Sequence, residues 1–162
     1  MVDVVEVVDA GSPLFRRTKS SHFLARAMEK KASYSRLSKS EVKAIYEQVK
    51  RHVTPSGNKF GCDISNYAPV KVKSGERSYS QVRFKSIKYH CHIIACMINR
   101  DCRPPSNGEE ASHLCHTVNC VRPEHLTFES GDVNKSRLCC RLFGHLPTYR
   151  CPHTPSCLNA SA

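Results

Sequence analysis

The sequence predicts a small α+β domain built around a short antiparallel sheet. Apolar residues at helical spacing over 38–53 supply the first helix. Short alternating runs between 60 and 98 supply the strands. The third observation concerns residues 111–157, which contain six of the ten cysteines and five of the nine histidines. We therefore expect side-chain ligands, as well as a hydrophobic core, to hold the sheet and helices together.

The chain of 162 residues is long enough for one compact domain. We divide it into a flexible basic leader (1–35), a folded domain (36–158, with its core at 60–158) and a tail (159–162). The basic residues of the leader fit contacts to DNA phosphates or a nuclear import patch. Its composition fits a solvated, disordered segment at least as well, and the sequence leaves this choice open.

The composition is strongly basic, with 25 Lys and Arg against 14 Asp and Glu and a formal net charge of +11. Such an excess attracts polyanions, of which nucleic acid is the commonest, and a merely soluble basic protein is the plain alternative. The start of the chain lacks the basic region of a secretory signal, and no apolar run reaches the roughly 18 residues of a membrane span. We expect an intracellular, nuclear protein with no membrane partner, in a reducing compartment that keeps thiols free.

Residues 38–53 predict one clear helix. Ser38 stands three positions before Glu41, which is the arrangement of a capping box. Apolar residues then follow at helical spacing, namely Val42, Ile45, Tyr46 and Val49. The turn residues at 54–57 end the helix. We expect the apolar stripe to pack against the core.

The stretch from residue 60 to 98 changes to strand character. Residues 79–84 alternate between two faces, and a turn at 85–86 leads into a second strand at 87–94. This arrangement predicts an antiparallel pair. The end of the stretch, 92–97, fits a helix as well as a strand because its apolar residues are nearly continuous.

Four further segments complete the expected domain. Residues 99–108 have the composition of a loop, and 111–119 are expected to form a strand and a turn. Residues 123–128 predict a short structured turn, and 130–138 predict a helix. Gly131 is an unfavourable residue near the start of that helix.

The cysteines and histidines of the C-terminal part form two blocks. The first block holds Cys115, Cys120 and His125, and the second begins at Cys139–Cys140 and closes with Cys151, His153 and Cys157. Zinc binds four such sulfur and imidazole donors and accepts several loop lengths between them. A disulfide scaffold is the alternative, but interleaved histidines add nothing to a disulfide framework. We therefore expect zinc.

The same segment resembles the His-Cys box homing endonucleases, the zinc-containing branch of the ββα-metal (His-Me finger) nucleases. The resemblance is carried by SHLCH at 112–116, Cys120, Pro-x-His-Leu at 123–126, Glu129-Ser130, NKSR at 134–137 and the closing Cys-x-His-x3-Cys. It covers residues 60–158, most strongly from 111 onward. It implies a ββα-metal motif held by two zinc sites and preceded by the N-terminal helix and the leader.

The resemblance also implies the complete ligand sets. The family brings one cysteine from a distant upstream strand, which implies Cys62, although Cys62 alone also fits a small buried hydrophobe. Family spacing favours Cys140 over Cys139. The implied sites are Cys62, Cys115, Cys120 and His125 for the first zinc, and Cys140, Cys151, His153 and Cys157 for the second. Four protein donors leave no open position, so both zinc ions are expected to be structural.

A candidate catalytic pair follows from the same resemblance. In the family, the histidine of the SHLCH run is the general base and the asparagine opening the next helix is the protein ligand to magnesium; these are His113 and Asn134. A neutral histidine accepts a proton near neutral pH, and an amide oxygen suits Mg²⁺. Taken singly, His113 fits a structural histidine and Asn134 a helix cap. The family also places an arginine of the preceding sheet on the scissile phosphate, and Arg83 is our candidate with Arg77 as its rival.

We therefore expect a metal-dependent endonuclease that hydrolyses duplex DNA, with two structural zinc ions and one catalytic Mg²⁺. A non-catalytic zinc-dependent DNA-binding or regulatory protein is the alternative, and a zinc module for protein contacts is a third reading. Double-stranded DNA is the expected partner, and Gln81 and Arg83 are of types that reach base edges. The family dimerises by exchanging long C-terminal tails, for which the five residues after Cys157 are too short. Two-fold DNA cleavage nevertheless favours a homodimer.

Overall fold

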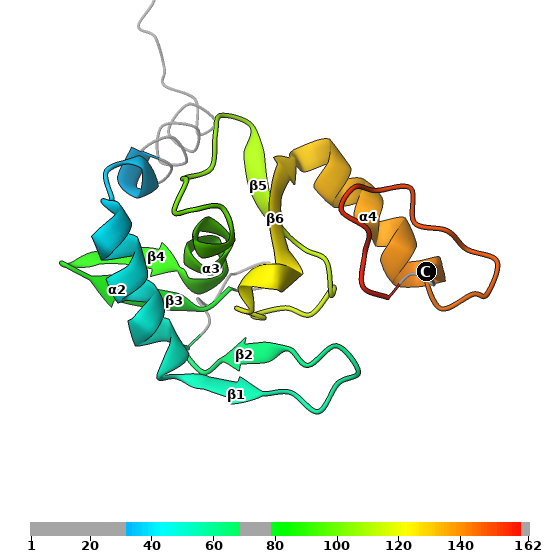
Figure 1. Ribbon diagram of the computed structural model, residues 1–162, viewed down its shortest axis with the longest axis horizontal. Helices are drawn as coiled ribbons and strands as arrows, with labels where there is room; N and C mark the ends of the chain where they lie inside the picture. Colours follow the sequence, from blue (N-terminus) through cyan, green and yellow to red (C-terminus); the bar gives the residue numbers. More distant parts are fainter. Residues whose placement is uncertain (1–31, 69–78, 160–162) are drawn as a thin grey trace, which may run out of the picture.

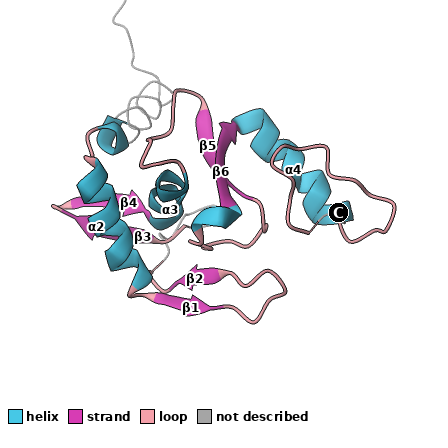
Figure 2. Ribbon diagram, in the orientation of Figure 1, coloured by secondary structure: helices cyan, strands magenta, loops and turns pink. Residues whose placement is uncertain are grey.

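The computed structural model describes residues 32–68 and 79–159 (Figure 1). In chain order its elements are α2 (Lys39–Lys50), β1 (Val53–Pro55), β2 (Asp63–Ser65), β3 (Gln81–Phe84), β4 (Ile87–His90), α3 (Cys91–Asn99), β5 (Glu109–His113), the 3₁₀ turn η1 (Pro123–His125), β6 (Leu126–Ser130) and α4 (Gly131–Phe143). The α+β class is confirmed. The described strands form three two-stranded antiparallel sheets, β1–β2, β3–β4 and β5–β6, where the sequence predicted one small sheet (Figure 2).

The helix α2 begins as the sequence predicts. The Ser38 side chain accepts from the backbone NH of Glu41, and the Glu41 carboxylate accepts from the backbone NH of Ser38, so the capping box is complete. Three residues of its apolar stripe are fully buried, as expected. The helix ends at Lys50 and not at residue 53, because Val53 already pairs with Ser65 in the β1–β2 ladder.

The predicted hairpin is confirmed in β3 and β4, which pair with Phe84 opposite Ile87. The turn residues Lys85 and Ser86 both have positive φ angles, 45° and 66°, as a tight two-residue hairpin turn requires. The second strand stops at His90 and not at residue 94, and α3 begins at Cys91. This helix is buried along most of its length, so it lacks the one-sided period that marks a surface helix.

The hydrophobic core surrounds α3. In Figure 1, α3 lies between α2 with the β3–β4 hairpin on one side and the β5–β6 hairpin on the other. Ile45 and Val49 of α2 and Ile94 and Met97 of α3 are fully buried in this cluster. Tyr34 is also buried there, and residues 32–35 are helical. The folded part therefore begins a few residues before the expected boundary at residue 36.

The β5, β6 and α4 elements form a continuous ββα unit. The two strands pair from Glu109 opposite Ser130 to His113 opposite Leu126. The prediction of a turn over 123–128 is wrong for its second half, because only Pro123–His125 turns and β6 follows at once. The helix begins with Ser130 as its N-cap and runs to Phe143, five residues beyond the predicted end.

Several expectations concern residues outside the described ranges. These are the leader up to residue 31, the rival Arg77, and the last residues of the tail. Among the helices that the structure describes, none has the length and apolarity needed to cross a bilayer.

Candidate zinc sites and catalytic pocket

The first Cys/His site joins segments that are distant in the sequence. The ligand atoms of Cys62, Cys115, Cys120 and His125 all lie within 4.8 Å of one another, and all four residues are buried. His125 Nδ1 is 3.6 Å from Cys62 Sγ and 3.5 Å from Cys120 Sγ. An antiparallel bridge between Ile64 and Cys120 brings the β2 segment to the loop after β5. Cys62 therefore supplies the fourth donor that the local spacing lacks.

The second site closes the loop after α4. The ligand atoms of Cys140, Cys151, His153 and Cys157 lie within 4.8 Å of one another. His153 Nδ1 is 3.2 Å from Cys140 Sγ and 3.3 Å from Cys151 Sγ. The structure brings Cys140 into this group, whereas Cys139 is exposed and outside it.

The donor chemistry of both groups fits zinc. Each group offers three thiol sulfurs and one imidazole nitrogen, a set that zinc binds in a closed tetrahedral site. All ten cysteines lie in the described ranges and all are free thiols, which argues against a disulfide scaffold. The hydrogen bond from the Cys120 thiol lowers the pKa of Cys115 and raises that of Cys120 itself. A thiolate is therefore already favoured at the first site, and the two Cys3His sites support two structural zinc ions.

A pocket of about 680 Å³ lies between β5 and α4. His113 enters it from the end of β5, and Asn134 from the first turn of α4. Three basic side chains, Lys135, Arg137 and Arg141, line the same pocket. The structure thus brings the two predicted catalytic residues together in one pocket with two exposed basic residues, Lys135 and Arg141, whereas Arg137 is buried and paired with Glu129.

The His113 ring is held by a backbone carbonyl. Its Nε2 lies 3.2 Å from the carbonyl oxygen of Cys120. Because a carbonyl oxygen only accepts, this contact is a hydrogen bond that the protonated Nε2 donates. The Tyr79 ring stacks parallel to His113, with centroids 6.0 Å apart and planes inclined by 4°, and His92 lies at 5.4 Å. We did not predict Tyr79 or His92 at the site, because no local pattern links them to His113.

The Asn134 amide is bound at both ends. Ser112 Oγ donates to Asn134 Oδ1 at 2.8 Å, and Asn134 Nδ2 donates to Glu110 Oε2 at 2.9 Å. Glu110 and Ser112 share one face of β5 because side chains alternate along a strand. The sequence analysis identified neither Glu110 nor Ser112 as a partner of Asn134, although their spacing of two residues, just before His113, was a visible signal.

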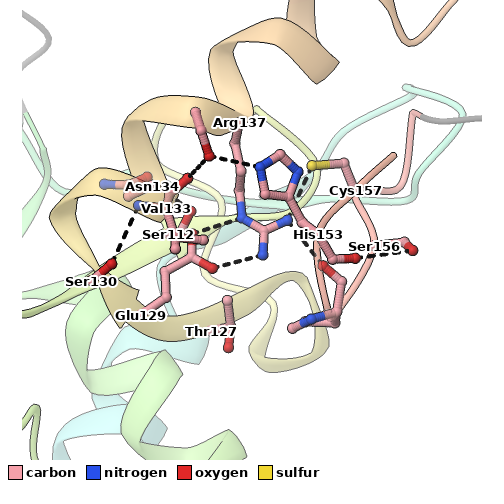
Figure 3. A network of polar contacts seen from close by, with 12 residues as sticks. Ser112, Thr127, Glu129, Ser130, Val133, Asn134, Arg137, His153, Ser156 and Cys157 are labelled. Atoms are coloured by element: carbon pink, nitrogen blue, oxygen red, sulfur yellow. Dashed lines mark hydrogen bonds and ion pairs between the residues drawn. The ribbon is translucent and has the colours of Figure 1, made fainter. Parts of the chain in front are cut away.

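Arg137 connects α4 to the second Cys/His site, as Figure 3 shows. Its side chain is only 2% exposed and forms two hydrogen bonds of 2.7 Å to the Glu129 carboxylate. It also donates to the carbonyl of Pro155 at 3.0 Å and to Cys157 Sγ at 3.1 Å. Burial raises the pKa of the Cys157 thiol, and the Arg137 guanidinium opposes that rise. Nearby, Ser136 Oγ lies 2.7 Å from Nε2 of His153, which orients that imidazole.

Arg83 does not join this group of residues. It is exposed on β3 opposite Lys88 and does not line the pocket. Its neighbour Gln81 makes a side-chain contact of 3.3 Å with Nε2 of His90. A contact between Arg83 and a scissile phosphate stays a prediction, and Arg77 lies outside the described part of the chain.

The sequence matches a family model described as the zinc-binding loop region of homing endonuclease. The match spans residues 58–161, which is more than half of the chain and includes all eight Cys/His ligands, His113 and Asn134. No curated protein matches the sequence.

Proposed function

Because this chain belongs to the homing-endonuclease family defined by that zinc-binding loop region, we propose that it is a metal-dependent endonuclease that hydrolyses phosphodiester bonds in duplex DNA. The observation that carries the proposal is the meeting of His113 and Asn134 in one basic pocket. Either residue alone has an ordinary structural explanation. Together they provide a base and a hard oxygen ligand at one surface, which phosphodiester hydrolysis requires.

His113 is the proposed general base. With Nε2–H directed at the Cys120 carbonyl, Nδ1 is the ring nitrogen that we propose takes a proton from water. The carbonyl also stabilises the imidazolium that forms, because the N–H donor becomes more acidic when the ring is charged. Cys120 belongs to the first zinc site, so that site fixes the backbone against which the base is held.

Asn134 is the proposed protein ligand for Mg²⁺. Its Oδ1 has two acceptor positions, and the Ser112 hydroxyl occupies one of them, so one acceptor position remains for a hard cation. When bound, Mg²⁺ supplies charge neutralisation at the scissile phosphate and the departing 3′ oxygen. The two Cys3His sites have complete ligand sets and are proposed to be structural.

Duplex DNA is the proposed substrate. The net charge of +11 and the basic lining of the pocket support backbone contacts beside the catalytic pair. Arg83, exposed on the β3–β4 hairpin, is proposed to contact phosphate or base edges outside the pocket. This substrate and the basic leader support a nuclear location, and cleavage of both strands is proposed to use two copies of the chain.

A plasmid assay tests the proposal. Zinc-loaded protein is incubated with a pool of supercoiled plasmids with and without Mg²⁺, beside His113→Ala and the control His145→Ala, which changes an exposed histidine outside the pocket. We expect Mg²⁺-dependent nicking or linearisation that His113→Ala lowers by a factor of about 10² to 10⁴ and His145→Ala leaves unchanged. Tight, salt-sensitive DNA binding without cutting would favour the non-catalytic regulatory alternative.

A further inference from the structure

The Asn134 amide can take two orientations, and only one of them presents its oxygen to a cation. An asparagine side chain presents an oxygen at one end and an NH₂ group at the other, and rotation by half a turn exchanges them. Only the oxygen is a ligand for a cation. Ser112 does not select the orientation, because its hydroxyl donates to Oδ1 as it stands and would accept from Nδ2 if the amide turned.

Glu110 selects the orientation of the Asn134 amide. An ionised carboxylate only accepts hydrogen bonds, so the contact of 2.9 Å to Glu110 Oε2 must come from Asn134 Nδ2. The oxygen is then forced to the other end, where Ser112 donates to it. The Glu110 carboxylate is also the negative charge nearest to this amide in the hydrogen-bond network, and such a charge favours a divalent cation on the adjacent oxygen.

Gly131 makes room for this carboxylate. A Cβ atom on Gly131 would lie 3.2 Å from Glu110 Oε1, so the carboxylate would have to move by a few tenths of an ångström to admit it. This glycine stands at the first position of α4, where its low helix propensity is otherwise unexplained. The carboxylate consequently lies over the N-terminal end of the helix, where the backbone dipole favours a negative group.

We propose that Glu110 is a positioning residue for the metal-binding amide, holding Asn134 so that Oδ1 and not the NH₂ group is presented to the cation. This inference rests on the proposed nuclease function. It assigns Glu110 no contact with substrate, and Gly131 is the residue whose missing side chain permits the arrangement.

The test compares Glu110→Ala, Glu110→Gln and Gly131→Ala with the control Glu47→Ala, which removes an exposed carboxylate from α2 far from the pocket. We expect Glu110→Ala to raise the Mg²⁺ concentration for half-maximal cleavage by at least about tenfold, as loss of an outer partner of a metal ligand does. The Mg²⁺ requirement of Glu110→Gln is expected to fall between those of Glu110→Ala and the wild type. A Gln side chain can still accept the hydrogen bond from Asn134, but because its amide also donates, it no longer excludes the other orientation. DNA affinity and zinc content are expected to stay unchanged.

Gly131→Ala gives the inference a signature that a purely structural role would not show. Alanine is the better helix former, so the thermal midpoint is expected to hold or rise, while the Mg²⁺ requirement rises as the carboxylate is displaced. A variant that loses stability and activity together, or keeps the wild-type Mg²⁺ requirement, would overturn the inference. If the wild type cleaves DNA and Glu110→Ala shows the same dependence on Mg²⁺ concentration, this inference is overturned and the proposed function is left intact.

A spectroscopic measurement separates the two proposals. In ¹⁵N-labelled zinc-loaded protein, the Asn134 side-chain NH₂ signals are expected to move in Glu110→Ala, which removes the contact, and to keep their positions in the control Glu47→Ala. This result is expected whether or not the protein cuts DNA. An Asn134 signal indifferent to Glu110 would refute the contact itself, and a protein with the contact but without cleavage would refute the proposed function and the catalytic role of Glu110 together.

Discussion

Arg137 Nη1 lies 3.1 Å from Cys157 Sγ, so the helix that carries Asn134 is tied directly to a ligand of the second Cys3His site. The same guanidinium holds the Glu129 carboxylate of β6 with two hydrogen bonds. One buried cation therefore joins the strand, the helix and the C-terminal loop (Figure 3). The second site thereby fixes one wall of the pocket that His113 and Asn134 line.

Removing this cation is expected to destabilise the fold strongly. Arg137→Met leaves the Glu129 carboxylate buried without its partner, and breaking a buried ion pair on one side costs about 3–5 kcal/mol. Urea unfolding at constant zinc concentration measures the change. The control is Lys39→Met, which breaks the exposed pair with Asp101 and is expected to change stability far less, because water screens an exposed ion pair. Equal effects of the two substitutions would contradict the role given to Arg137.

The Arg137–Glu129 pair also predicts a dependence of stability on pH. Burial raises the pKa of the Glu129 carboxyl, but the hydrogen bonds from Arg137 outweigh it and hold that pKa below its ordinary value. A carboxyl with a lowered folded-state pKa stabilises the fold at all pH values above the ordinary Glu pKa of about 4.3, and this contribution is lost as the pH falls through the lowered value. Wild type and Glu129→Gln are compared by urea unfolding from neutral pH downward. We expect the stability difference to shrink only at acidic pH, and a difference independent of pH would contradict the assignment.

The adjacent cysteines of α4 give a direct test of the second site. Cys140→Ser is expected to lower the bound zinc from two ions per chain to one, because it removes a donor from a four-ligand set. Cys139→Ser is the matched control and is expected to keep both ions, because Cys139 is exposed and outside the set. Zinc content measured by elemental analysis after gel filtration decides the matter. Loss of zinc from both variants, or from neither, would contradict the assignment of Cys140.

The sequence was most informative where one signal acts over a few residues. The capping box of Ser38 and Glu41 located the start of α2, and the alternation through Val82 located β3 and its hairpin. The two ligand groups could be assembled because short spacings marked six of the donors. The resemblance was needed to prefer Cys140 over Cys139. Cys62 required the resemblance, since no local pattern links it to a loop more than fifty residues away.

The remaining features depend on tertiary contacts that a local pattern does not encode. The run from Cys91 to Met97 is apolar on all sides because α3 is surrounded by the core, so its period does not distinguish helix from strand. The partners Glu110, Tyr79 and Arg137 are defined by contacts across elements. The sequence shows that Gly131 is an unfavourable residue at the start of a helix. Its contact with the Glu110 carboxylate, which gives a reason for the glycine, appears only in the structure.

Imidazole rescue tests the central claim most directly, because it asks whether His113 acts through its ring nitrogen. His113→Gly removes the ring and leaves a space beside Tyr79 and the Cys120 carbonyl. With zinc content and DNA affinity verified as wild type, we expect Mg²⁺-dependent cleavage to be lost and then partly restored by added imidazole, in proportion to its neutral form. Cleavage by His113→Gly at the wild-type rate without imidazole would contradict the assignment of His113 as the general base.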